Sequence, residues 1–466
     1  MTTSFPPLKA PLKALLETPP RDTWAIPQLA LPSNVWVLEL PSPPREPDSF
    51  VSGFTVTSHI FPGAYPRYSF LEPRRWSSTS SNPILNDAPS DSAPKAVRMK
   101  WATERRDAFI EKCKQIYAAR AHKLPEDGPG EKDGLGPVTW NVVNRYARVA
   151  KPGPNDKRCG ITVISWHANG LHKETYEPTY RHLISLCDQA TSTVRVDEFW
   201  SIEAANAGDS AIINGDVFGD YQDGIDHVRD ALNFLEYYLP KKPYDSSPPL
   251  HLPHHTTSLS STSRFLVALG HCFGGSVLAN AACSRPSLFR SLTLVEPILL
   301  RNVDMSLAWL SLAVLTRRQH WKSREEAKSL LQQHPTFMPW TPEALDLYVR
   351  HALCDAPGGG VTLKMSRFVE AAIMTHAATY MDTWDMLERL PKGVRLRWIM
   401  AEQTNMSSKE TMHNMVWLRK GNSSNVLVLG GNHFLVQQKP DVVAEATFED
   451  WNDMIGLRAN ETMAKL

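Results

Sequence analysis

The sequence is poor in cysteine and carries almost no net charge. Its 466 residues include only six cysteines, and none of them forms a C-x-x-C pair. This excludes a disulfide scaffold and argues against a zinc knuckle or a thioredoxin-type site, so we expect a reducing, intracellular setting. The formal net charge of +1 gives no basis for nucleic acid or anionic lipid as a partner.

Long apolar runs are also missing. The most apolar stretch, MSLAWLSLAVL at 305–315, is too short to cross a bilayer, so we expect no membrane span. The N-terminus is interrupted by prolines and lacks the apolar core of a secretory signal. Residues 1–48 hold 11 of the 36 prolines, which excludes helix or central strand over most of this N-terminal arm. An edge strand at 34–40 is the most that we expect there.

The sequence does contain a regular alternation of strand and helix patterns. Continuous apolar runs, typical of buried parallel strands, occur at 159–167, 264–270 and 291–297. This rhythm predicts the α/β class, with a mostly parallel central sheet flanked by helices. An antiparallel pair at 50–62 and 138–149 opens it. The core covers 49–302 and 393–463, with loop insertions near 76–137 and 245–263.

Residues 303–392 interrupt this alternation between the expected sixth and seventh strands. Only helical signals occur there, among them a capping box from Ser323 to Glu326 and an N-cap at Thr341 before Pro342. An insertion at this point would cover the carboxyl ends of the strands, where open α/β sheets bind their ligands. We therefore predict a helical lid.

The segment LVALGHCFGG at 266–275 predicts a nucleophile on a sharp turn between a strand and a helix. It matches the pattern G-x-S-x-G with Cys272 in place of serine. Glycines on either side supply the small neighbours that such a turn requires, and the start of a helix favours a thiolate. The alternative is that Cys272 is an inert buried thiol in a chance turn.

A nucleophile of this kind needs a base and an orienting acid. The base is expected in the loop after the last strand, where VLVLGGNHFLV at 426–436 provides His433. For the acid we favour Glu296, at the end of the sixth strand, over Glu402, which follows the seventh. A salt bridge with Arg301 is the structural alternative for Glu296.

The oxyanion hole needs two backbone N–H donors. Phe273, which follows Cys272, would supply one. The loop SWHANGLHKE at 165–174 follows the third strand and would supply the other from Leu171. We expect His167 and Asn169 to stabilise this loop rather than to react.

Together these segments resemble a family of fungal peroxisomal α/β-hydrolases from secondary-metabolite and toxin clusters, whose members include hydrolases of mycophenolic acid and AK-toxin biosynthesis. The resemblance rests on GHCFGG, HANGLHKETYEP, WSIEAANAGDSAIIN, LTLVEP, GVTLKMSRFVEA and GGNHFLVQQKPDVVAE, and runs from about residue 50 to the C-terminus. It implies an α/β-hydrolase with nucleophile, acid and base on Cys272, Glu296 and His433. The family's nucleophile is normally serine, and its acid can be aspartate.

A cysteine nucleophile changes the expected chemistry. We expect hydrolysis of a small-molecule acyl thioester or ester through a covalent acyl-enzyme, with no cofactor and no metal. The intermediate would itself be a thioester, so transfer of the acyl group to an acceptor other than water stays open. A third hypothesis, of a different class, is a binding protein on a degraded hydrolase fold.

The final tripeptide, Ala464-Lys465-Leu466, is a close variant of the peroxisomal address Ser-Lys-Leu. It predicts a peroxisomal location and an import receptor as a partner, in agreement with the compartment of the family that the chain resembles.

Overall fold

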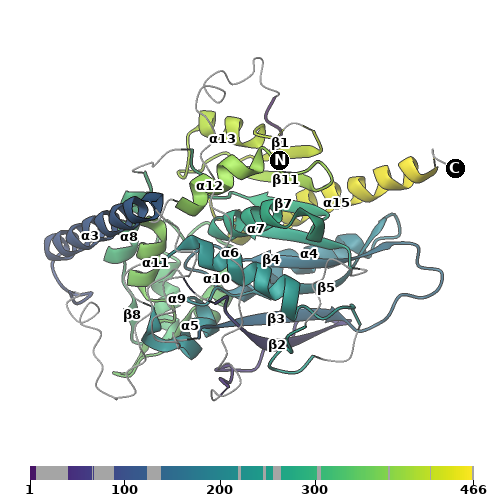
Figure 1. Ribbon diagram of the computed structural model, residues 1–466. Coiled ribbons are helices and arrows are strands. Elements are labelled where there is room, and N and C mark those ends of the chain that lie inside the picture. The colour runs from purple at the N-terminus through teal and green to yellow at the C-terminus, as the bar shows by residue number, and fades with distance from the viewer. Residues whose placement is uncertain are drawn as a thin grey trace.

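A nine-stranded sheet forms the centre of the protein (Figure 1). The architecture comes from a computed structural model, which describes residues 1–6, 40–65, 67, 89–122, 138–218, 222–244, 248–255, 264–301, 306–375, 378–419 and 421–463. Its strand order is β1-β12-β11-β7-β6-β4-β5-β3-β2. The strands are β1 (Thr2–Thr3), β2 (Phe54–Pro62), β3 (Trp140–Arg148), β4 (Cys159–Trp166), β5 (Val194–Ile202), β6 (Leu266–His271), β7 (Ser291–Val295), β11 (Arg395–Ala401) and β12 (Ser423–Val428).

The sheet is mostly parallel, as the sequence predicts. The strands from β5 through β4, β6, β7 and β11 to β12 pair in parallel. The expected antiparallel opening pair is β2 with β3, and β3 joins the sheet antiparallel to β5. The carboxyl ends of the parallel strands therefore share one edge, where the candidate site residues gather.

Helices cover both faces of the sheet. Helices α4 (Glu177–Cys187) and α15 (Pro440–Met463) lie on one face, and α6 (Gly224–Asn233) and α7 (Phe273–Ser284) on the other. Each face of the sheet has its own hydrophobic core, and successive residues of β4 point into the two cores alternately. Val163 packs on the face covered by α4 and α15, and Ile164 packs on the face covered by α7. The predicted α/β class is confirmed. The shorter helices of the core are α5 (Gly208–Asn214), α13 (Lys409–Val416) and α14 (Leu435–Gln438).

The insertion between β7 and β11 is only partly as predicted. Its helices are α8 (Ser306–Thr316), α9 (Arg324–Leu331), α10 (Pro342–His351), α11 (Arg367–Thr375) and α12 (Ala378–Leu387). The expected caps are present, because the side chains of Ser323 and Thr341 each accept a backbone hydrogen bond at a helix start. The expectation of helices alone is wrong. Strands β8 (His320–Trp321), β9 (Leu353–Asp355) and β10 (Val361–Leu363) form a small sheet, and each is too short to show an alternating pattern.

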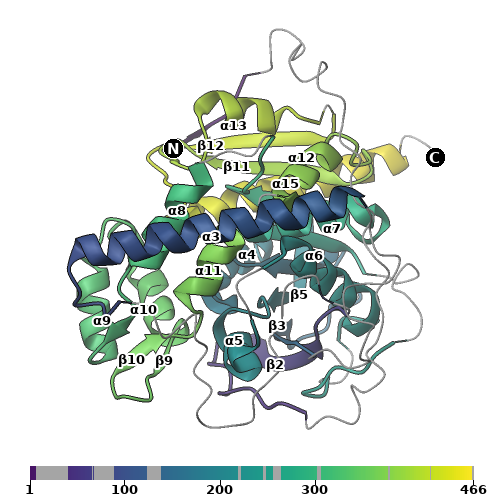
Figure 2. The same cartoon turned by 60° about the vertical axis from the view of Figure 1, so that its left-hand side comes forward.

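The loop insertion predicted near 76–137 also needs correction, because residues 95–122 form the long helix α3 (Lys95–His122). Figure 2 shows α3 lying across the insertion. Ala102 and Phe109 of α3 pack against Val314 of α8 and Phe368 of α11. Helix α3 has few apolar residues and many polar ones, so its sequence shows no clear helical periodicity of apolar positions and did not predict a helix.

The N-terminal residues add an edge strand at a place that the sequence did not suggest. Strand β1 pairs antiparallel with β12, and the Phe5 N–H donates to the side chain of Asn425 at 2.8 Å. The edge strand expected at 34–40 falls, apart from Leu40, outside the described residues, as does the tripeptide 464–466. Among the described helices, none is long and apolar enough to cross a membrane.

Candidate active site

Cys272 lies at the turn between β6 and α7, with its backbone in an uncommon conformation. Its φ is 55°, in the left-handed region that residues with a Cβ rarely adopt. The turn is tight enough that a Cβ on Gly274 would lie 2.1 Å from the carbonyl oxygen of Trp166. The Cys272 N–H donates to the Val295 carbonyl at 3.0 Å, which ties the turn to the neighbouring strand. This geometry is that of the predicted nucleophile turn.

Helix α7 begins at Phe273, directly after Cys272. The first N–H groups of a helix have no partner within the helix, so the Phe273 N–H is available to a ligand beside the thiol. The same helix end favours negative charge through its dipole. Sulfur and N–H donor are therefore adjacent, as an acyl-transfer site requires.

His433 and Glu296 lie together at the carboxyl edge of the sheet, His433 after β12 and Glu296 after β7, with β11 between the two strands. The Nδ1 atom of His433 is 3.3 Å from Oε2 of Glu296. The other carboxylate oxygen of Glu296 accepts a hydrogen bond of 2.7 Å from the Ala401 N–H. Glu296 is 2% exposed and has a φ of 45°, so the acid too is held in an uncommon conformation.

The protonation of His433 depends on both neighbours. Burial opposes its positive charge, but a thiolate at Cys272 and the carboxylate of Glu296 together raise the pKa of His433 to about 10. The site therefore favours a protonated imidazole at His433. The structure brings the three predicted residues within reach of one another.

Glu402, the alternative acid, has a different partner. Its Oε2 accepts a hydrogen bond of 2.9 Å from the Gly430 N–H, in the turn that leads to His433. It therefore supports the turn from outside, while Glu296 is the carboxylate that contacts the imidazole ring.

Two further residues near Cys272, His271 and Tyr380, were not predicted from the sequence to belong to the site. His271 Nε2 is 2.8 Å from the carbonyl oxygen of His433, and burial lowers the pKa of His271 to about 3, so it stays neutral. Tyr380 of α12 is buried, and both this burial and a thiolate at Cys272 raise its pKa. The insertion thus reaches the nucleophile. His271 occupies a variable position of the G-x-S-x-G pattern, and Tyr380 belongs to no recognisable motif.

The loop after β4 is ordered, but its expected donor is already engaged. The Leu171 N–H donates to the carbonyl oxygen of Ala168 at 3.1 Å, so it would serve an oxyanion only as a shared donor. His167 is structural, as predicted: its Nε2 accepts from the Ala204 N–H at 3.1 Å, and burial lowers its pKa to about 4. The Asn169 amide donates to the carbonyl oxygen of Glu370 at 3.0 Å.

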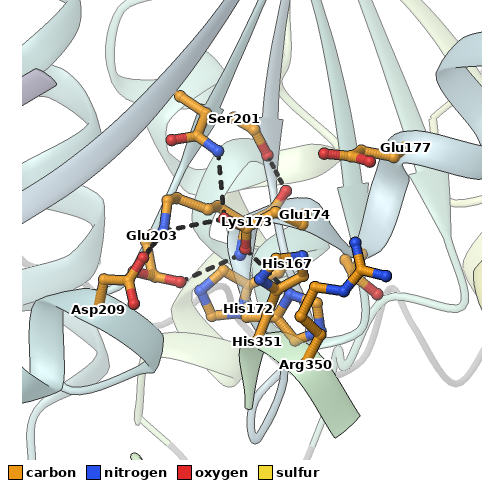
Figure 3. A network of polar contacts seen from close by, with 12 residues as sticks. His167, His172, Lys173, Glu174, Glu177, Ser201, Glu203, Asp209, Arg350 and His351 are labelled. Carbon is orange, nitrogen blue, oxygen red and sulfur yellow. Dashed lines mark hydrogen bonds and ion pairs between the residues drawn. The ribbon is translucent and has the colours of Figure 1, made fainter. Parts of the chain in front are cut away.

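A second buried cluster of charge, which the sequence analysis missed, continues from this loop (Figure 3). At its centre the Nζ atom of Lys173 lies 3.1 Å from Glu174, 3.3 Å from Glu203 and 2.5 Å from Asp209. We call it the Lys173 network; its members are Arg45, Lys173, Glu174, Glu203, Asp209 and Lys364. Among the described residues, no group of histidine, cysteine and acidic side chains could hold a metal ion.

Comparisons with known proteins bear on the family. The model of the Alpha/beta hydrolase family matches residues 163–446. Type I acyl-CoA thioesterase mpaH of Penicillium brevicompactum is 31% identical over 223 residues, which cover 47% of this chain and 45% of that protein. Abhydrolase domain-containing protein AFT2-1 of Alternaria alternata is 33% identical over 113 residues, 22% of this chain and 42% of that protein. The chain thus spans less than half the length of these curated relatives.

Among solved structures, the peroxisomal alpha-beta-hydrolase Lpx1 of Saccharomyces cerevisiae matches with a TM-score of 0.56. The identity is 18%, and the match covers 72% of this chain and 86% of that one. A likeness at this identity bears on the fold alone. With the curated relatives, it confirms the resemblance to fungal α/β-hydrolases.

Proposed function

Because this chain belongs to the alpha/beta hydrolase family, we propose that it cleaves an acyl thioester or ester through Cys272, His433 and Glu296. The observation that carries the proposal is the strained turn at Cys272, with His433 close enough that a thiolate at Cys272 raises its pKa, and with Glu296 3.3 Å from the Nδ1 atom of the His433 ring. This is the order nucleophile, base and orienting acid that acyl transfer uses.

Acylation would begin from the thiolate–imidazolium pair. The sulfur of Cys272 attacks the carbonyl carbon of the substrate, and the negative charge that develops on the carbonyl oxygen is stabilised by the Phe273 N–H. Collapse of this intermediate breaks the bond to the leaving group. His433 donates its proton to the departing thiolate or alkoxide, which leaves an acyl thioester on Cys272 and a neutral imidazole.

Deacylation would reverse these roles. The neutral imidazole of His433 removes a proton from water, the hydroxide attacks the acyl carbon, and the carboxylic acid leaves as Cys272 returns to thiolate. Glu296 orients the ring and stabilises the imidazolium in both steps, since it accepts from Nδ1. Atoms and protons balance over one cycle of hydrolysis.

An acyl-CoA is the substrate class that we propose. The Penicillium relatives, which are named type I acyl-CoA thioesterases, support it. The sulfur nucleophile favours a second candidate as well, because exchange of one thioester for another costs little free energy. An alcohol, amine or thiol could then compete with water for the acyl group, which would make the protein an acyltransferase.

Intact-protein mass spectrometry tests the proposal. After mixing with a panel of acyl-CoAs, the wild type should gain the mass of one acyl group, and Cys272→Ala should not. Iodoacetamide should label Cys272 more slowly in His433→Ala, because the thiolate loses its counter-ion. If no acyl adduct forms and His433→Ala labels as fast as the wild type, the chain is a binding protein on a hydrolase fold.

A second measurement separates hydrolysis from transfer. The products of one acyl-CoA are compared with and without an added alcohol or amine. Free acid alone in both samples supports the hydrolase, whereas an ester or amide that forms only with active protein supports the transferase.

We also propose a peroxisomal location, which is supported by the similarity to Lpx1, a peroxisomal alpha-beta-hydrolase. The partner would be the import receptor that reads Ala464-Lys465-Leu466. A fluorescent protein fused ahead of the full chain should collect in peroxisomes, and removal of Leu466 should leave it in the cytosol. An unchanged distribution would exclude this address.

A further inference from the structure

The cations of the Lys173 network come from three separate parts of the chain. Arg45 belongs to the N-terminal arm, Lys173 to the loop at 165–174, which we call the oxyanion loop, and Lys364 to the insertion, directly after β10. Figure 3 shows Lys173 pointing toward Glu203 and Asp209, with Glu174 close by. The network therefore joins segments that neither the sheet nor its flanking helices connect.

Asp209 is the residue at which all three parts meet. Its Oδ2 lies 2.5 Å from Lys173 Nζ and 3.0 Å from Arg45 Nη2, and its Oδ1 lies 2.6 Å from Lys364 Nζ. Only 4% of the Asp209 side chain and 6% of the Lys364 side chain are exposed. Burial opposes the charge of Asp209, but Lys173, with Lys364 and Arg45, lowers its pKa to about 2. One carboxylate thus links the oxyanion loop to the insertion.

The insertion contacts the oxyanion loop at a second point, through Glu370. Gly170 has a φ of 79°, and a Cβ there would lie 2.6 Å from Oε1 of Glu370 on α11. Asn169 donates to the Glu370 carbonyl oxygen, and Arg317 holds the Glu370 carboxylate with one contact of 3.0 Å. Leu171 therefore lies between residues 169–170, which contact Glu370, and Lys173, which pairs with Asp209.

We propose that Asp209 and Lys364 are positioning residues for acyl transfer, which align the backbone at Leu171 only when the insertion is docked on the core. The proposal rests on the function proposed above, because an acyl-transfer site needs a second oxyanion donor besides the Phe273 N–H, and Leu171 is the candidate. Leu171 N–H donates to Ala168 in the present geometry, so its direction is set by how the turn is held. A sub-ångström change in that turn would alter its aim at a substrate oxygen.

The network offers substitutions that remove the bridge between Asp209 and Lys364 from either side. In Asp209→Asn, Lys173 keeps Glu174 and Glu203 as counter-ions, while the bridge to Lys364 loses its charge. Lys364→Met removes the bridge from the other side, and Lys364→Arg restores a cation. Asp346→Asn is the matched control, since Asp346 pairs with Lys328 at 2.5 Å on the exposed side of the insertion.

The experiment compares two reactions of the same thiol in the full-length protein. Acylation by p-nitrophenyl acetate needs both the thiolate and an oxyanion donor and is followed by the burst of p-nitrophenolate. Alkylation by iodoacetamide needs the thiolate alone. We expect Asp209→Asn and Lys364→Met to slow acylation at least about tenfold, because one oxyanion donor accounts for about 100-fold or more. Alkylation should stay within about twofold of the wild type, and Lys364→Arg and Asp346→Asn should preserve both rates.

Two results would overturn the inference. If acylation and alkylation fall in parallel, the network only stabilises the fold; if acylation keeps the wild-type rate, the bridge has no part in it. These results are distinguishable from failure of the proposed function. In that case the wild type itself would give no burst, whereas a normal wild-type burst with unaffected variants removes this inference alone.

Discussion

Two buried clusters lie near the two ends of the oxyanion loop: Cys272 with its partners near one end, and the Lys173 network at the other. They differ in the number of charged partners around the central cation. His433 has one carboxylate beside it, at 3.3 Å. Lys173 has three carboxylates within 3.3 Å. The candidate base therefore has a single carboxylate beside it, whereas the lysine at the centre of the network is enclosed by three.

The backbone shows the same difference. Cys272 and Glu296 adopt positive φ angles, at a cost on the order of 1–3 kcal/mol each. Lys173 begins a regular 3-10 helix, Lys173–Tyr176, and shows no such strain. Strain is concentrated where the bond changes would occur, and charge pairing where the backbone has to be held still.

The largest effect is expected from removal of the sulfur. Cys272→Ala should lower kcat/KM for an acyl-CoA by about 10⁴-fold or more, because the covalent route is lost. Release of free CoA, followed with a thiol reagent, measures this. Cys272→Ser should retain more activity than the alanine variant. Activity of Cys272→Ala within tenfold of the wild type would assign the chemistry to another group.

The next effect tests which acid orients His433. Glu296→Gln should lower kcat by about 10²- to 10³-fold, since a neutral amide neither stabilises the imidazolium nor fixes the ring as well. Glu402→Gln is the matched control and should stay within about threefold, because its carboxylate contacts only a backbone N–H. Equal losses in the two variants would contradict this division of roles.

Removal of the central cation of the network should act on stability first. Lys173→Met removes the ion-pair partner of the buried Glu203, while Glu174 and Asp209 keep Arg45, so the free energy of unfolding in urea should fall by about 3–5 kcal/mol. Asp346→Asn, which breaks an exposed ion pair, should change it by less than about 1 kcal/mol. A loss of similar size in both would mean that the network is no stronger than a surface pair.

The smallest effect concerns pH. In the folded protein the pKa of His433 is about 10, above its ordinary value of 6.5. The contribution of its positive charge to folding stability is therefore fully present below pH 6.5 and is lost as the pH rises through 10. Single-turnover acylation, measured by rapid quench, should therefore stay level between pH 7 and 9 and fall above 10 as the proton donor disappears. A decline that already begins between pH 7 and 8 would refute the thiolate–imidazolium pair.

The sequence was a good guide wherever a signal is local. Cys272 follows an apolar run and precedes glycines, His433 follows the last strand, and Glu296 ends a buried strand; each can be located within about ten residues of sequence. The parallel sheet is predictable for the same reason, because its strands are continuous apolar segments.

The features that could not be predicted from the sequence depend on contacts between residues far apart in the chain. Lys173, Asp209 and Lys364 look like solvated charges, and only the folded chain shows that they neutralise one another. Helix α3 is stabilised by the apolar residues of α8 and α11, and the short strands of the insertion by one another. Leu171 was a plausible donor by position, but the turn bond to Ala168 is a matter of geometry.

The backbone around residue 272 has a consequence for how such enzymes diverge. The turn is held by main-chain hydrogen bonds: the Cys272 N–H donates to Val295, and the Cys272 carbonyl accepts from Ile298 at 3.2 Å. Neither bond involves the side chain, so oxygen and sulfur can replace each other there without disturbing the scaffold. Under the proposed mechanism, a single-atom exchange between serine and cysteine would change the acyl-enzyme from an ester to a thioester while the backbone that holds it stays the same.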